Sequence, residues 1–190
     1  MANNLRELTH EQHKRAEKSK FINRLLKGSI TPAEYYSYLT EQFYMYSVLE
    51  DCAQDQGVFN NIQEVRRATA ISKDLQELEK EHGFNPPAKP MKSTTKYVNY
   101  IKANRENSKK LLAHIYVRHM GDLSGGQIIK RFVHGSGNMY MFDADVNVLK
   151  DKLREKLDDS LAEEAIHCFD MTTEFLEELE ASFGNMGTTN

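Results

Sequence analysis

Two short stretches of this sequence combine residue types that could hold and transform a ligand. Near the amino end, His13 is followed one helical turn later by Glu17. A metal-binding histidine usually passes its second ring proton to an acceptor, and a glutamate at i+4 is placed to accept it. The alternative is an ordinary ion pair on a helix surface that involves Lys14 or Lys18. The spacing alone leaves both interpretations open.

The second stretch runs from Gly121 to Gly126, where three of six residues are glycine inside a run of helical apolar spacing. Each glycine costs a helix about 1 kcal/mol relative to alanine. One interpretation is a turn, in which Gly121 ends one helix and Ser124 with Gln127 caps the next. The other is a kinked helix whose backbone lies against a flat ligand, because residues without a Cβ allow such an approach. Asp122 then directs a carboxylate at that ligand.

Several cations and tyrosines could complete such a site. The candidates are Arg6, Arg118, Lys150, Arg154, Tyr46 and Tyr116. A solvated helix face is the default for each cation, although Lys150 and Arg154 lie one turn apart and could jointly hold a carboxylate. Tyr46 and Tyr116 lie on otherwise apolar sides, which is typical both of core tyrosines and of a pocket wall.

Two other chemistries are weighed against these residues. The Glu-x-x-His spacing of di-iron bundles occurs at Glu7 and His10, Glu79 and His82, and Glu164 and His167. Such pairs must face a bundle interior, whereas the wheel of the last helix directs Glu164 and His167 away from its apolar side. Cys52 and Cys168 lack activating neighbours in the sequence, so we interpret them as core or surface residues and not as a disulfide, zinc ligands or nucleophiles.

Composition limits the class of protein. The chain has 190 residues and a formal net charge of -3. This length suits one domain, and the charge argues against a nucleic-acid binder, which would show a concentrated basic excess. No apolar run approaches the ~20 residues that cross a bilayer, and the first residues lack the blocks of a signal peptide. We therefore expect a cytoplasmic protein without a membrane anchor.

The periodicity of apolar residues predicts an all-α domain over 1–184 with a flexible tail at 185–190. Helices are expected at 5–17, 21–26, 32–54, 61–82, 95–104, 108 into the glycine stretch, 145–157 and 160–183. Thr31, Pro32 and Glu34 mark one start, and Ser160 with Glu163 marks another. The passage 134–144 reads as loop or one short strand.

The residues of both stretches resemble the heme oxygenases. His114-Ile-Tyr-Val-Arg-His-Met-Gly-Asp-Leu-Ser-Gly-Gly-Gln-Ile-Ile-Lys130 is similar to the distal-helix motif of that family nearly end to end. Thr9 to Glu17 resembles the proximal-helix motif, and Tyr46 to Glu50 also agrees. The resemblance implies a single helical domain in which heme lies between the first helix and the kinked glycine helix.

The resemblance also implies roles for individual residues. His13 becomes the iron ligand, Glu17 its hydrogen-bonding partner, and Asp122 the holder of a catalytic water network with Arg118 and Tyr46. The implied heme contacts of the distal helix are Gly121, Ser124, Gly125 and Gly126. The implied partners of the heme propionates are Arg6, Tyr116, Lys150 and Arg154. Heme has two carboxylates at one rim of an apolar disc, so cations there are expected.

The implied reaction is oxidative cleavage of heme b, both cofactor and substrate, at its α-meso carbon. O2 and external electrons are consumed, and biliverdin IXα, carbon monoxide and ferrous iron are formed. The family implies ferredoxin or a flavoprotein reductase as electron donor and a downstream bilin reductase as a further partner. The absence of a heptad repeat favours a monomer. The alternatives are a heme carrier or sensor without turnover, and a helical hydrolase of thiaminase type with a reactive cysteine.

This sequence departs from the family pattern at two places. His119 and Met120 stand where tyrosine and leucine are more usual, which changes the polarity expected of the pocket. The passage 134–144 is shorter than in other members, which affects the expected loop contacts on the distal side.

Overall fold

The structure, a computed structural model, describes residues 4–184, and within this range the chain is helical and contains no strand. The helices are α1 (Leu5–Leu8), α2 (His10–Glu17), α3 (Lys20–Leu26), α4 (Pro32–Asp55), α5 (Ala68–His82), α6 (Lys92–Ala103), α7 (Ser108–Leu123), α8 (Gly126–Ile129), α9 (Val146–Arg154) and α10 (Ala162–Gly184). The predicted all-α class is confirmed. The predicted tail, 185–190, lies outside the described residues.

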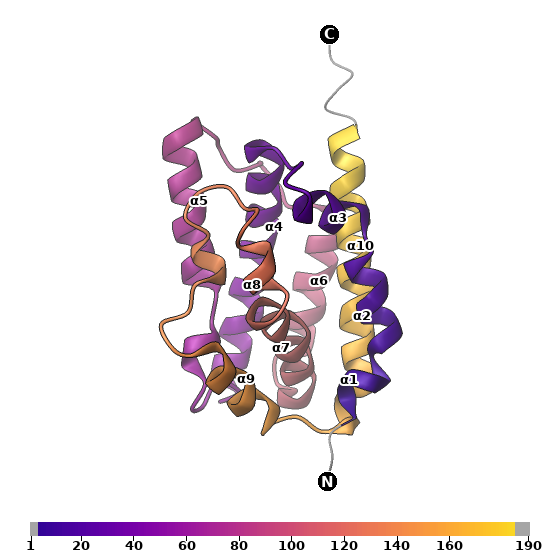
Figure 1. Ribbon diagram of the computed structural model, residues 1–190. Coiled ribbons are helices and arrows are strands. Elements are labelled where there is room, and N and C mark those ends of the chain that lie inside the picture. The colour runs from indigo at the N-terminus through magenta and orange to yellow at the C-terminus, as the bar shows by residue number, and fades with distance from the viewer. Residues whose placement is uncertain (1–3, 185–190) are drawn as a thin grey trace.

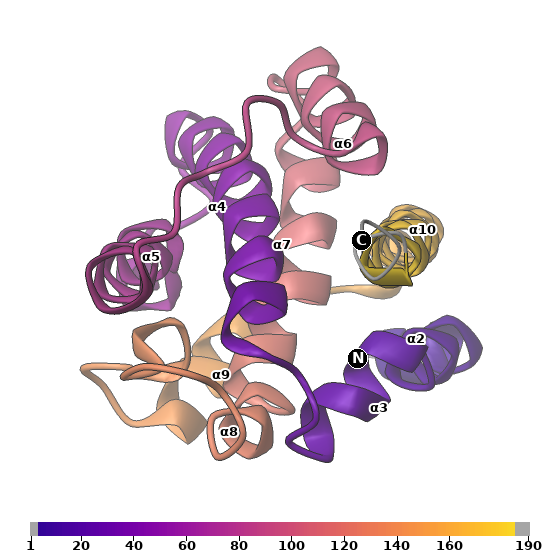
Figure 2. The ribbon, with the colours of Figure 1, turned by 90° about the horizontal axis from the view of Figure 1, so that it is seen from above.

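Two central helices organise the bundle. α4 and α7 lie side by side in its middle, with α5 on one side and α10 on the other (Figures 1 and 2). α2 and α3 pack on α10, and α6 lies at the side of the bundle, where it packs on α4 and α10. α9 packs on α7. α10 therefore contacts both α2, which contains His13, and α7, which contains the start of the glycine stretch.

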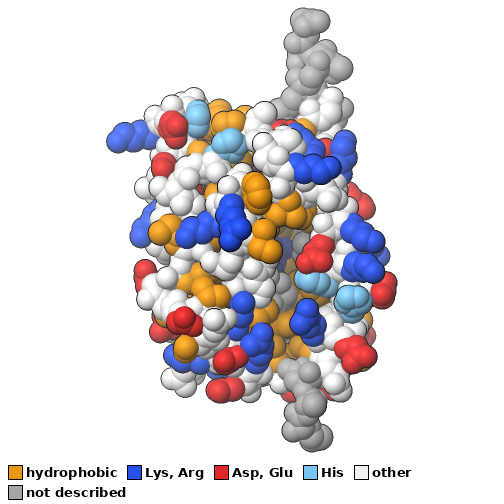
Figure 3. Space-filling model, viewed as in Figure 1, with side chains coloured by type: hydrophobic (Ala, Val, Ile, Leu, Met, Phe, Trp, Pro, Cys, Tyr) orange, Lys and Arg blue, Asp and Glu red, His pale blue; other side chains and the backbone are white. Residues whose placement is uncertain are grey.

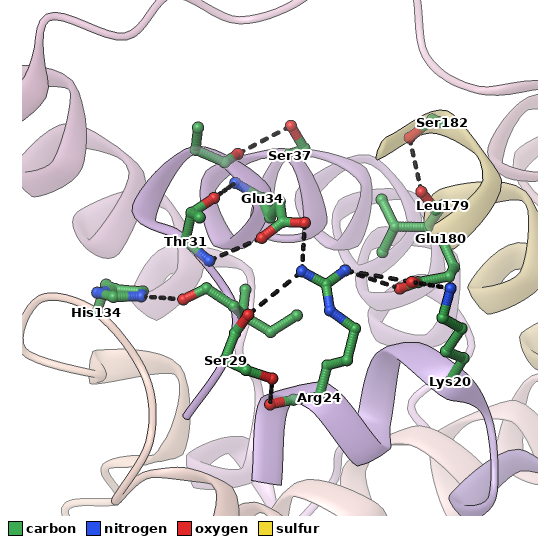
Figure 4. A network of polar contacts seen from close by, with 12 residues as sticks. Lys20, Arg24, Ser29, Thr31, Glu34, Ser37, His134, Leu179, Glu180 and Ser182 are labelled. Carbon is green, nitrogen blue, oxygen red and sulfur yellow. Dashed lines mark hydrogen bonds and ion pairs between the residues drawn. The ribbon is translucent and has the colours of Figure 1, made fainter. Parts of the chain in front are cut away.

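The start of α4 forms as the sequence predicts. Thr31 accepts a hydrogen bond from the backbone N–H of Glu34, and the Glu34 carboxylate accepts one from the Thr31 N–H at 2.8 Å. Arg24 of α3 donates to this same carboxylate and, at 3.1 Å, to Glu180 of α10 (Figure 4). The capping box thus also joins α3, α4 and α10.

The predicted helix 61–82 is wrong at its start. Asn61 has a positive φ of 65°, and α5 begins only at Ala68. The Glu50 carboxylate of α4 accepts hydrogen bonds from the backbone N–H groups of Arg67 and Ala68. The first N–H groups of a helix need an acceptor, and here it comes from a residue far away in sequence. Local spacing therefore could not locate this boundary.

Two further boundaries also differ from the prediction. The helix expected at 5–17 is interrupted at Thr9, whose hydroxyl donates to the Leu5 carbonyl at 2.8 Å. The cap expected from Ser160 is wrong, because Asp158 accepts from the Ser160 N–H and the chain makes a 3-10 turn before α10 begins. At both places a hydrogen bond between a side chain and the nearby backbone competes with the regular hydrogen bonds of a helix.

The passage 134–144 is a loop with one 3-10 turn, Asn138–Tyr140, and α5 holds it in place. The buried Asp74 carboxylate accepts from the Asn138 N–H, the Asn138 side-chain amide and the Met139 N–H at 2.7–2.8 Å. Glu77, one turn later, accepts from the Ser136 N–H at 2.9 Å. The short loop is therefore fixed by two carboxylates of one helix.

We expect Asp74→Asn to lower the free energy of unfolding by about 2–3 kcal/mol, because an amide offers fewer acceptor sites to one buried and two part-buried donors. Urea unfolding at neutral pH measures this loss. Glu77→Gln is the control, since its partner Ser136 is exposed and bonds in water contribute about 1 kcal/mol or less. Equal losses in the two variants would contradict the role given to Asp74.

Candidate active site

The amino-terminal candidate pair lies on α2. The imidazole Nε2 of His13 is 3.5 Å from the Glu17 carboxylate, and the side chain of His13 is 48% exposed. Its ring packs edge-on against Phe169 of α10, with centroids 5.5 Å apart. Phe169 and Glu17 thus hold the ring from two sides. One ring nitrogen faces the carboxylate, which leaves the other available to a ligand.

The glycine stretch forms a kink and not a capped turn. α7 continues through Gly121 to Leu123, Ser124 leaves the helical region at φ -111° and ψ -85°, and α8 starts at Gly126. Gln127 does not form the alternative cap, because its amide donates to the carbonyls of Asp122 and Tyr140. The chain therefore bends with its backbone exposed on one side.

The outer side of this kink is open. A Cβ added to Gly121 would meet nothing within 4 Å, and one added to Gly125 would meet only the Gly121 carbonyl, at 3.7 Å. Figure 3 shows hydrophobic side chains at the surface over α8 and in the strip between α7 and α2. Ile128 of α8 is 55% exposed. Bare backbone beside exposed apolar side chains suits one face of a flat apolar ligand.

Asp122 lies buried on the other side of the kink. The hydroxyl of Tyr46, from α4, donates to Asp122 Oδ2 at 2.7 Å. Arg118, one turn earlier on α7, is also buried, with its guanidinium 4.2 Å from the Tyr97 ring centre and hydrogen-bonded to Gln42. The expectation that Arg118 lies on a solvated helix face is therefore wrong. The structure does bring the three predicted residues Asp122, Arg118 and Tyr46 together.

Burial raises the pKa of Asp122 to about 6, even though nearby His119, Tyr46, Arg67 and Arg118 favour the carboxylate. A carboxyl group that titrates near neutral pH can both hold and release a proton under working conditions. The site therefore combines an open apolar face with a buried carboxyl group whose pKa lies near the working pH.

Comparison with known proteins shows the family of this chain. Residues 1–178 match the family model described as heme oxygenase. The chain belongs to the heme oxygenase family. It is thereby an oxidoreductase of heme degradation, and its fold and class agree with those that the sequence predicts.

The relatives cover nearly the whole of this heme oxygenase. A heme oxygenase of the red alga Porphyra purpurea is 30% identical, with 96% of this chain and 87% of the relative covered. The crystal structure of a Synechocystis heme oxygenase-1 in complex with heme has a TM-score of 0.81 at 26% identity, with coverage of 96% and 95%. The Leptospira interrogans heme oxygenase structure has a TM-score of 0.79 at 31% identity, with coverage of 92% and 97%.

No helix within residues 4–184 has the length and apolarity to span a membrane.

The glycines of this heme oxygenase do not all serve the same purpose. A Cβ on Gly126 would come within 2.6 Å of the Tyr140 ring. Gly126 is buried, and its lack of a side chain lets the loop after α8 fold back onto α7. Packing alone therefore requires this glycine, and its predicted contact with heme stays a prediction. Gly121, Ser124 and Gly125 are exposed on the open side.

The four candidate partners of the heme propionates come from three helices. Arg6 is exposed on α1, Tyr116 is half-buried on α7, and Lys150 is half-buried on α9. Arg154 is exposed and forms a 2.7 Å ion pair with Asp151 one turn earlier. The structure thus gives Arg154 a competing partner in its own helix. The joint carboxylate site of Lys150 and Arg154 stays a prediction.

The alternative chemistries find little support. Within the described residues no group of three or more His, Cys, Asp and Glu side chains could hold a metal. Glu164, expected to face outward, is instead part-buried and 3.0 Å from the buried His114. Cys168 does have activating neighbours: although burial opposes this, His114 and Arg118 lower the pKa of its thiol. Its complete burial nevertheless keeps it from a substrate.

Sequence reasoning missed one polar pair of the site. His119 of α7 and Glu50 of α4 are fully buried, and His119 Nε2 lies 2.9 Å from Glu50 Oε1. Glu50 is one turn after Tyr46, and His119 lies one turn before Asp122. Glu50 therefore lies on the face of α4 that holds Tyr46, and His119 lies on the face of α7 that holds Asp122. This spacing is the signal in the sequence that could have revealed the pair.

Proposed function

We propose that this heme oxygenase binds heme b between α2 and the kink that joins α7 to α8, with His13 as the iron ligand and Glu17 as its hydrogen-bonding partner. The open backbone at Gly121 and Gly125 is the observation that carries the proposal. Side chains at these two positions would stand between the distal helix and the ring. His13 would hold the heme iron through one imidazole nitrogen.

We infer cleavage at the α-meso carbon to biliverdin IXα, carbon monoxide and ferrous iron. Bound heme supplies both the iron that binds O2 and the carbon that is oxidised. The protein supplies position and protons: Asp122 can hold a proton at its carboxyl group and pass it on through water, while Tyr46 orients that group. Arg118 provides a buried positive charge beside them. The α-meso position depends on how the propionate partners Arg6, Tyr116, Lys150 and Arg154 set the ring.

Electrons must come from a partner, which we propose to be ferredoxin or a flavoprotein reductase. The red algal and cyanobacterial relatives favour ferredoxin, because photosynthetic lineages use it for this purpose. A downstream bilin reductase is the partner that would consume the product. The monomeric state and the cytoplasmic location expected from the sequence stay predictions.

Turnover in the presence of hemin, O2 and reduced ferredoxin or ascorbate tests this function. The Soret band should disappear as absorption in the red rises, and chromatography should identify biliverdin IXα as the product. A heme carrier or sensor, the alternative function, would keep its Soret band under the same conditions. The buried Asp122 next to the open face favours the enzyme, since a carrier has no use for a proton source there.

The glycines offer a sharper test of where heme binds. We expect Gly121→Ala to stabilise the heme-free protein by up to about 1 kcal/mol, since alanine favours a helix and meets no neighbour. It should weaken heme binding about tenfold or more, because its methyl group separates backbone and ring.

Gly126→Ala is the matched comparison within the same stretch. Its methyl group would clash with Tyr140, so the heme-free protein should lose about 1–3 kcal/mol of unfolding free energy. Thermal melting measures stability, and hemin titration followed at the Soret band measures affinity. Unchanged heme affinity in Gly121→Ala would argue against a ligand on this face.

A further inference from the structure

Arg67, directly before α5, is a buried arginine that is bonded to backbone and not to a carboxylate. It is 6% exposed, and within residues 4–184 its guanidinium donates only to backbone carbonyls. Two of these carbonyls belong to Glu64 and Val65, in the turn before α5. The other two belong to Met139 and Met141, 72 and 74 residues later in the chain. Burying a charge is costly, so this arrangement needs a reason.

The two distant carbonyls stand on either side of Tyr140. Arg67 Nη1 lies 2.5 Å from the Met141 oxygen and 3.4 Å from the Met139 oxygen. The guanidinium also lies over the Phe142 ring, 3.9 Å from its centre. A guanidinium suits this task, because its donors are fixed in one plane and can reach several carbonyls at once. The loop after α8, which passes beside α5 on its way to α9 (Figure 1), is thus held against the start of α5.

Tyr140 in turn contacts the kink between α7 and α8 at two points. Its ring fills the space of the missing Gly126 side chain, since a Cβ there would come within 2.6 Å of it. Its carbonyl accepts a hydrogen bond from the Gln127 side-chain amide at 3.1 Å, and the same amide donates to the Asp122 carbonyl at 3.2 Å. Tyr140 is 2% exposed. The loop therefore supports the kink from its buried side.

The kink needs this support because its own hydrogen bonds are few. α8 has only four residues, and a helix of that length is not stable in isolation. Ser124 leaves the helical region, and Gly121 and Gly125 have no side chains that could pack. Contacts from other elements must therefore fix where the backbone of the kink lies.

We propose that Arg67 is a positioning residue for heme turnover: it fixes the backbone on both sides of Tyr140, and Tyr140 fixes the kink whose bare backbone at Gly121 and Gly125 faces the ligand. That this ligand is heme rests on the proposed function. The link from Arg67 to the kink does not, because all of its contacts exist in the heme-free protein.

Hydrogen exchange of the heme-free protein tests the link. The Ile128 and Ile129 N–H groups donate to the Gly125 carbonyl at 2.9 and 3.0 Å, so their exchange reports opening of the kink. Arg67→Met keeps the length of the side chain but removes its donors. Because the kink is held through the Arg67 bonds, these two amides should exchange about tenfold faster or more in this variant.

Two comparisons separate positioning from stability alone. An arginine that only stabilised the fold would slow the amides that exchange by global unfolding, such as Leu176 in α10, and its loss would leave Ile128 and Ile129 unchanged. That outcome would overturn the proposal. Arg66→Met is the matched control, because it removes the neighbouring arginine, whose side chain is 38% exposed and makes no hydrogen bond to residues 134–144. It should leave exchange at Ile128 unchanged, and equal increases in the two variants would count against the proposal.

Arg67→Lys provides a second variant, which keeps the charge. Its ammonium has three donors for four carbonyls, so exchange at Ile128 should rise by a smaller factor than in Arg67→Met, and an unchanged rate would again overturn the proposal. If neither variant folds, exchange of the unaltered protein in increasing urea decides. The Ile128 and Met141 amides should then open in one step, and separate steps would refute the link.

The heme complex gives a readout that ties Arg67 to the reaction. A kink that is no longer fixed should expose a second meso carbon, so Arg67→Met should form a second biliverdin isomer. Lost stability alone would lower the yield of one isomer, and a single isomer from this variant would contradict the positioning role. If the unaltered protein degrades no heme, the proposed function fails, while the exchange rates still decide whether Arg67 fixes the kink.

Discussion

Replacing His13 with alanine is expected to reduce heme turnover more than about 100-fold, because no other side chain of α2 is placed to bind the iron from that side. His13 is held between Phe169 and Glu17, and its side chain is about half exposed. The apolar disc can still bind, so the complex should form with a shifted Soret band and without histidine ligation. Single-turnover spectra with reductant and O2 measure the loss.

A neighbouring histidine provides the control for this experiment. His10 lies on the same helix and is exposed, so the protein should turn over heme at the unaltered rate when His10 is replaced by alanine. The turnover rate of the Glu17→Gln protein should lie between those of the two alanine variants, about tenfold below the unaltered rate. An amide can still orient the imidazole, but it lacks the negative charge of the Glu17 carboxylate. If His13→Ala protein degraded heme as fast as His10→Ala protein, the assigned iron ligand would be wrong.

Asp122→Asn is expected to have two opposite effects, a loss of turnover and a gain of stability. An amide accepts the Tyr46 hydroxyl but cannot deliver a proton, so turnover should fall by about 10²–10⁴-fold. The same change removes a buried carboxylate whose ionisation is costly, because Asp122 is only 6% exposed. A functional group that destabilises the fold is the expected pattern for an active site.

The pH dependence of this stability gain has a definite sign. The pKa of Asp122 is raised from 3.8 to about 6, so between these values the folded protein binds a proton that the unfolded chain has released. The contribution of Asp122 to the free energy of unfolding therefore falls as pH rises from about 4 to 6. At about 1.4 kcal/mol per pKa unit, the loss reaches roughly 3 kcal/mol at neutral pH. The amide of the variant does not titrate, so the advantage of Asp122→Asn should grow by that amount between about pH 4 and pH 7.

Denaturant unfolding at several pH values measures this growing difference. Asp51→Asn is the control, since Asp51 is an exposed carboxylate of α4 and should show no comparable trend. A stability difference between Asp122→Asn and the unaltered protein that stays constant across this range would show that Asp122 is not buried as the structure has it.

The sequence alone determined the all-α class, some of the helix boundaries and the pieces of the site that depend on local spacing. The capping residues at Thr31 and Glu34 act within one turn, so their effect does not depend on the rest of the fold. The same holds for His13 and Glu17, which the pitch of a helix brings together. The three glycines between 121 and 126 indicated a break in α7 because helix propensity is a local property.

Only the tertiary structure decided which faces meet. Helical periodicity gives the phase of each helix but not its neighbours, so it could not show that Glu50 caps α5 and holds His119. It left Arg118 on a solvated face, whereas the packing of α4 on α7 buries it. It also could not separate Gly126, which makes room for Tyr140, from Gly121, which faces open space. These distinctions depend on side chains far apart in the chain, and their contacts exist only once the helices have packed.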